Sequence, residues 1–126
     1  MKTYIVTFAI ILLIIVGWFI IFDKVEYHCE SANKSLNKVI SHIDNNNWND
    51  AKKEFDKVTD KWSDIRSSWS ILLDHHEIDN IDLSMAKTNK YVSSKNPSLS
   101  LAEIEVLKKL FNIVKENEAL TLTNIL

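Results

Sequence analysis

Hydrophobic residues recur with helical spacing along most of the chain. The clearest pattern lies between residues 48 and 73, where apolar side chains alternate at steps of three and four residues, with charged residues between them. The positions of this seam, with an aromatic residue at every second one, are Trp48, Ala51, Phe55, Val58, Trp62, Ile65, Trp69 and Leu72. Such a heptad pattern predicts one long amphipathic helix. Its aromatic face is too large to stay in water, so the neighbouring segments are expected to cover it.

The first apolar stretch is continuous rather than periodic. No charged residue occurs from Tyr4 to Phe22, and a helix of that length crosses about 30 Å of hydrocarbon. A cleaved signal peptide is the competing interpretation, but residues 19–24 lack the small-residue pattern of a cleavage site. We therefore expect a transmembrane anchor over residues 1–23 and an extracytoplasmic helical bundle over residues 24–126.

The charges that flank this stretch bear on its orientation. Lys2 precedes it, whereas the charges of Asp23, Lys24 and Glu26 after it roughly cancel. Positive charge prefers the cytoplasmic side of a membrane. The prediction is a single-pass protein of the cell membrane with a cytoplasmic N-terminus and the C-terminal domain outside.

The helical pattern does not stop where the apolar stretch ends. Apolar residues from Val25 to Ile43 continue at steps of three and four, without Pro or Gly, so the anchor is expected to run straight into the first helix of the domain. The asparagine run at residues 45–47 then ends this helix, and Asn47 is a natural N-cap for the next. A turn this short makes the two helices antiparallel neighbours, which brings Trp69 back to the level of residues 22–25.

Two further helices complete the expected fold. Asp74 and Glu77 suit the start of a third helix, and apolar residues follow with the same spacing through residue 92. Ser100 and Glu103 form a capping-box pattern for a fourth helix, which we expect to end near Asn117. The predicted fold class is all-α, with an N-terminal transmembrane helix continuing into an antiparallel four-helix bundle.

Composition narrows the range of functions. Charged residues make up 25% of the 126 residues, the net charge is −2, and both signs are interspersed, which argues against a nucleic-acid partner. With one Gly and one Pro, the chain lacks glycine-rich phosphate loops. Its single cysteine, Cys29, excludes an internal disulfide. It is interpreted as a buried apolar residue, although a cross-link between two self-associated chains stays open.

One cluster of residues has the chemistry of a metal site. The candidate ligands are His75, His76, Asp79 and Asp82. On a helix these imidazoles and carboxylates share faces, which is the donor set that zinc uses. Acidic residues at a helix start are also explained by the helix dipole alone, so a structural turn is the simpler interpretation. Histidines at this position could also form a pH-sensitive contact.

Catalysis has little support in the sequence. Ser67, Ser68 and Ser70 precede the two histidines, but no glycine elbow or oxyanion nest accompanies them. We expect no enzyme activity and no cofactor.

Three features together identify a family resemblance: the tryptophan-rich second helix, the Asp74–Ile81 turn and the closing segment Glu118–Leu126. With them the chain resembles domain of unknown function 4363, a family of small single-span membrane proteins from low-GC, often spore-forming Gram-positive bacteria. The resemblance implies a cell-membrane location and a link with multi-pass membrane proteins, and it brings no activity or cofactor. The helical pattern also faintly resembles chemoreceptor ectodomains, although the chain lacks their second span.

The functional expectation is therefore binding. In this interpretation the chain is a membrane-anchored accessory or scaffold subunit for another membrane protein, with the lipid bilayer as its second partner. The exposed features that could carry such contact are the apolar tail and the turn, namely Leu122, Ile125, Leu126, His75 and His76. The alternative is an extracytoplasmic sensor whose bundle or turn binds a small molecule or a metal. Self-association into a homo-oligomer is a third hypothesis.

Overall fold

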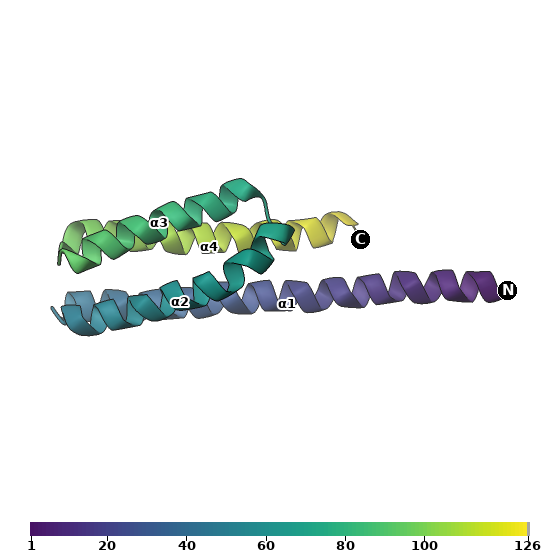
Figure 1. Cartoon of the computed structure of the whole chain (residues 1–126), viewed down its shortest axis with the longest axis horizontal. Coiled ribbons are helices and arrows are strands. Elements are labelled where there is room, and N and C mark those ends of the chain that lie inside the picture. Colours follow the sequence, from purple (N-terminus) through teal and green to yellow (C-terminus); the bar gives the residue numbers. More distant parts are fainter. Residues whose placement is uncertain (126) are drawn as a thin grey trace.

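The computed structural model describes the backbone of residues 1–125 and the side chains of residues 1–120 and 124. This part of the chain forms four helices, namely α1 (Lys2–Asp44), α2 (Trp48–Leu72), α3 (His75–Ser93) and α4 (Pro97–Ile125). They pack antiparallel into one bundle, in which α1 contacts both α2 and α4, and α3 closes the other side (Figure 1). The predicted all-α four-helix architecture is confirmed.

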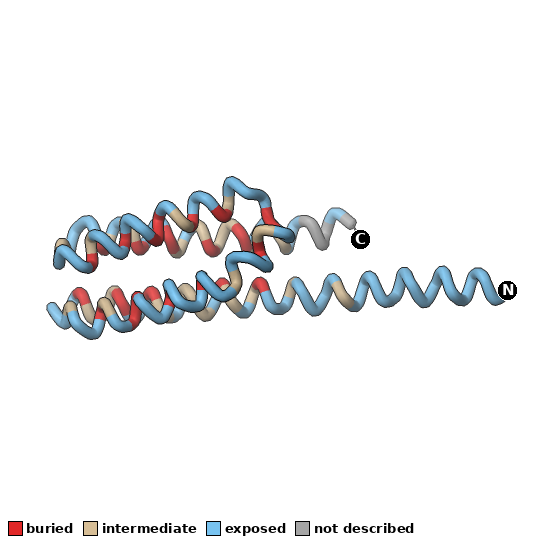
Figure 2. The backbone as a smooth tube through the Cα atoms, viewed as in Figure 1, coloured by how far each residue is buried: buried red, intermediate tan, exposed pale blue. Residues whose placement is uncertain are grey.

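Helix α1 is much longer than the bundle. Its 43 residues correspond to about 65 Å at about 1.5 Å per residue. Most of the N-terminal half projects beyond the other helices, and nearly all of its residues are exposed (Figure 2). This helix is long and apolar enough to cross a membrane, and a signal sequence would meet the same criteria. We call the end of the bundle nearest this apolar half the proximal end.

The aromatic seam of α2 is buried as predicted, except at its last position. The buried seam residues are Ala51, Phe55, Val58, Trp62 and Trp69, and Trp48 and Ile65 pack against them. Leu72 is 44% exposed, whereas Leu73 is only 8% exposed. The backbone of Leu73 is extended, with φ −107° and ψ 162°. Because the helix has ended, this residue turns into the core and takes the place predicted for Leu72.

The contacts between α1 and α2 confirm the expected register. The Nζ atom of Lys61 donates a hydrogen bond to the Oγ atom of Ser31 over 3.2 Å. Closer to the proximal end, Trp69 lines the same surface pocket as Val25 of α1. The aromatic helix therefore returns to the end of the apolar stretch.

Two turns use left-handed backbone without glycine. Asn46, between α1 and α2, has φ 59°, and Lys95, between α3 and α4, has φ 55°. The expected side-chain cap by Asn47 is not formed. Instead, the Oδ1 atom of Asn46 accepts a hydrogen bond from the indole Nε1 of Trp48 over 2.9 Å.

The predicted start and end of the fourth helix are wrong. Helix α4 begins at Pro97, a residue suited to the first helical position. The Oδ1 atom of Asn96 accepts from the backbone N–H of Leu99 over 3.0 Å, so Asn96 supplies the cap. Ser100 is buried inside the helix, and Glu103 accepts a hydrogen bond from Ser84 of α3 over 2.8 Å instead of closing a capping box. The helix also continues past residue 117, to Ile125.

These alternatives for the start of α4 can be separated by two alanine substitutions. Asn96→Ala should lower the free energy of unfolding by about 1 kcal/mol, because it removes the cap. Ser100→Ala should be neutral or stabilising, because the buried Oγ atom of Ser100 has no hydrogen-bond partner among the described residues. Denaturant unfolding of the full chain in detergent micelles, followed by tryptophan fluorescence, measures both. A larger loss of stability with Ser100→Ala than with Asn96→Ala would favour the capping box at Ser100 over the cap at Asn96.

Candidate functional site

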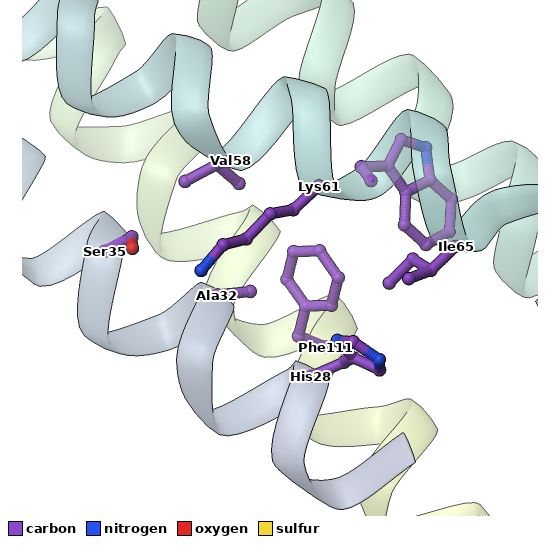
Figure 3. Close-up of a pocket in the computed structure, with 8 residues that line it drawn as sticks. His28, Ala32, Ser35, Val58, Lys61, Ile65 and Phe111 are labelled. Carbon is purple, nitrogen blue, oxygen red and sulfur yellow. The ribbon is translucent and has the colours of Figure 1, made fainter. Parts of the chain in front are cut away.

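The interior of the bundle is closely packed. Figure 3 shows a pocket between α1, α2 and α4 whose cavity volume is about 10 Å³. It is lined by His28, Ala32, Ser35, Val58, Lys61, Trp62, Ile65 and Phe111. A volume of about 10–15 Å³ holds no more than one water molecule. This pocket is therefore too small for a ligand or cofactor.

A series of aromatic rings crosses the bundle toward its proximal end. The Trp62 ring lies edge-to-face against Trp69, with centroids 5.6 Å apart, and against Phe111 of α4 at 6.0 Å. Trp69 in turn contacts His28 of α1 at 6.3 Å, and His28 contacts Tyr27 at 5.6 Å. Edge-to-face contacts of this kind add to the gain from burial alone. The rings therefore fix α1, α2 and α4 relative to one another.

His28 is a member of this series that the sequence interpretation missed. Partial burial lowers the pKa of His28, and the charges of Lys61 and Lys24 lower it further. The imidazole is therefore mainly uncharged at neutral pH and packs as an aromatic ring. Its position carried a signal, because His28 lies three residues after the core residue Val25 and four before Ala32.

A polar cluster joins α2 to α3 beside the rings. The Nε1 atom of Trp62 donates to Asp82 over 2.7 Å. Arg66 donates to the same carboxylate from Nε over 2.8 Å and approaches it with Nη2 at 2.7 Å. Partial burial acts to raise the pKa of Asp82, but the hydrogen bonds from Arg66 and Trp62 outweigh it and hold that pKa below its ordinary value. Asp82 is thus an ionised structural acceptor.

The candidate metal ligands do not come together. Asp82 is engaged by Trp62, while His75, His76 and Asp79 are exposed on α3. Among the described residues, no group of three or more His, Cys, Asp or Glu side chains could hold a metal ion. Asp74 accepts a hydrogen bond from the backbone N–H of His76 over 2.9 Å. The predicted capping role of this turn is confirmed.

The serines near this turn lie in the last turns of α2. Ser67 and Ser68 are exposed. The Oγ atom of Ser70 donates to the backbone carbonyl of Ser67 over 2.7 Å, a contact within the helix.

The proximal end carries a surface groove with mostly apolar walls. Its volume is about 200 Å³, and it is lined by Trp18, Ile21, Phe22, Ile71, Leu72 and Glu118. We call it the proximal groove. Its walls come from α1, α2 and α4, and Ile71 at the end of α2 is 85% exposed.

Glu118 is the charged residue of the proximal groove. Partial burial raises the pKa of its carboxyl, and the nearby carboxylate of Glu77 raises it further. Glu77 itself accepts a hydrogen bond from the side chain of Asn117. The proximal groove therefore combines mostly apolar walls with a carboxyl group that protonates more readily than an ordinary glutamate.

The chain matches a known protein family. The family model described as Domain of unknown function (DUF4363) matches residues 19–125. The chain belongs to this family. No curated protein and no solved structure matches the chain.

The DUF4363 region begins inside the apolar half of α1. It includes Ile21 and Phe22 of the proximal groove together with Ile71, Leu72 and Glu118. Of the groove residues, only Trp18 precedes it. The region that defines the family thus contains the junction between the apolar helix and the bundle.

Part of the predicted interaction surface lies outside the described residues. This concerns Leu126 and the side chains of Leu122 and Ile125. The other two predicted contact residues, His75 and His76, are exposed at the proximal end of the DUF4363 domain. Cys29 is fully buried, and burial raises the pKa of its thiol to about 12. A disulfide between two chains through Cys29 would therefore require the bundle to open.

The link between α2 and α3 can be tested through Asp82. Asp82→Asn should lower the free energy of unfolding of the DUF4363 domain at neutral pH by about 1 kcal/mol, because charge-assisted hydrogen bonds are weakened. The folded pKa of Asp82 lies below its ordinary value of 3.8. Its stabilising contribution is therefore present above about pH 4 and is lost as the pH falls through the folded pKa.

Unfolding curves of the wild type and the variant should converge at the lowest pH. Asp60→Asn is the matched control, because Asp60 is an exposed carboxylate on α2. Equal effects of the two substitutions, or a gap that does not narrow with acid, would contradict the assigned role of Asp82.

Proposed function

We propose that the chain is a membrane-anchored helical interaction protein, an accessory or scaffold subunit for another membrane protein. The apolar half of α1 crosses the cell membrane with its N-terminal end in the cytoplasm, and the bundle stands on the outer face. One observation carries the proposal. The apolar stretch of α1 is not buried by any described part of the chain, and so large an apolar surface requires lipid or protein around it.

The continuity of α1 supports an anchor rather than a separate leader. The helix passes from Phe22 to Val25, the first buried residue of the core, without a break. Cleavage near residue 24 would cut a helix whose next turn already packs in the bundle.

The packing of the bundle supports binding at its surface. The cavity between α1, α2 and α4 holds at most one water molecule, which leaves less support for a sensor that encloses a small molecule. The surfaces proposed for a protein partner are the proximal end, with His75 and His76 exposed, and the predicted contact residues of the tail.

Membrane attachment is tested by fractionation. The full chain should stay in the membrane pellet after alkaline carbonate and high salt, and it should migrate at its full mass of 14.6 kDa. Release into the soluble fraction, or a product shorter by about two dozen residues, would remove the anchor from the proposal.

Partner binding is tested by purification from native membranes in two detergents. A membrane protein should copurify in a constant ratio with the full chain, and deletion of residues 121–126 should reduce that ratio several-fold. Lys53→Ala, at an exposed site on α2, is the control and should leave it unchanged. Equal recovery with the deletion would exclude the tail as the contact. A melting temperature raised by Zn²⁺ would favour the sensor instead.

A further inference from the structure

The turn between α2 and α3 places apolar residues where a bundle surface is normally polar. Ile71 is 85% exposed and Leu72 is 44% exposed, although both close a helix whose other large apolar residues are buried or packed on the core. No described contact within the chain explains this pair. Packing within the described part of the chain therefore does not account for apolar residues at these two positions.

Ile71 and Leu72 lie beside the end of the apolar stretch of α1. Ile71 and Leu72 line the proximal groove together with Trp18, Ile21 and Phe22. These three residues lie at the C-terminal end of the uncharged stretch, which ends at Phe22. Ile71 and Leu72 thus lie level with the end of the segment assigned to the membrane. Figure 1 shows the α2–α3 turn level with the middle of α1, where the last turns of α2 bend away from the axis of α1.

We propose that the α2–α3 turn is a second membrane contact, with lipid of the bilayer interface filling the proximal groove. The proposal rests on the membrane anchor proposed above. Lipid is the occupant because the groove is continuous with the apolar surface of α1: three of its wall residues belong to that surface. A turn held level with the end of a membrane span lies at the bilayer interface, where apolar side chains contact lipid.

The residues around the groove limit how deep the contact goes. Immediately after Leu73, the chain places Asp74, His75 and His76 in solvent, and α3 then leads away from the apolar half of α1. Glu118 forms the polar part of the groove wall. An apolar pair followed by polar residues suits the boundary between acyl chains and headgroups, where amphipathic elements bind with one face inserted.

Site-directed spin labelling tests the contact in the full chain. Single labels are introduced as Ile71→Cys, Leu83→Cys and Ile14→Cys, in vesicles of phosphatidylcholine and phosphatidylglycerol. Cys29 stays in place, because it is fully buried, and labelling of the unsubstituted chain measures its background. Accessibility to oxygen, which concentrates in lipid, is compared with accessibility to a water-soluble nickel chelate.

Leu83 is the matched control for Ile71. It is also a strongly exposed apolar residue, at 62%, but it lies eight residues into α3, about 12 Å farther from the groove at about 1.5 Å per residue. Ile14 reports on the anchor itself. We expect the ratio of oxygen to nickel accessibility to be high at Ile14 and lowest at Leu83. At Ile71 the ratio should be several-fold higher than at Leu83.

Each other outcome overturns the proposal in a distinguishable way. A label in lipid at Ile14 with equal ratios at Ile71 and Leu83 leaves the anchor in place and removes the second contact. Low access of both reagents at Ile71 means that protein rather than lipid covers the turn. A label in water at Ile14 removes the anchor, and the second contact with it.

Discussion

The fold depends on the burial of one indole. Trp62 lies at the meeting point of the helices, with Trp69 and Phe111 against its ring and Asp82 accepting its N–H. A buried indole needs both an apolar surround and an acceptor. Helix α4 provides part of the first, and α3 provides the second. The same side chain thus holds together helices that are far apart in the sequence, and Arg66 keeps the acceptor charged.

Much of this architecture could be predicted from the sequence because the apolar spacing is regular. The continuous first helix, the buried seam of α2 and the antiparallel return of Trp69 to the level of Val25 all follow from that spacing. The errors fall at helix ends, where periodicity carries no information. Leu73 replaces Leu72 in the core because its extended backbone reverses the direction of the side chain. Asn96 caps α4 because Pro97 already fits the first turn.

The candidate site was harder to predict than the fold. Tertiary packing brings His28 into the series of aromatic rings and Asp82 to the indole of Trp62. The helical spacing places His28 on the core face, but no local motif marks the role of Asp82. The sequence grouped Asp82 with His75 and His76 because these side chains share faces of a helix. In the structure Asp82 accepts the indole N–H of Trp62, whereas His75 and His76 are exposed. The groove was not predicted either, since it needs residues from three helices, with Glu118 far in sequence from Trp18.

The unbroken path of α1 has a mechanical consequence. Its 43 residues form one rod to which the rest of the bundle is fastened along the half beyond residue 22, a length of about 33 Å at about 1.5 Å per residue. Membrane helices tilt by about 20° on average. A tilt of that size would swing the far tip of the rod by roughly 11 Å. With the proposed membrane span, a change in tilt would be transmitted to the far end of the bundle, because α1 is one continuous helix from Lys2 to Asp44.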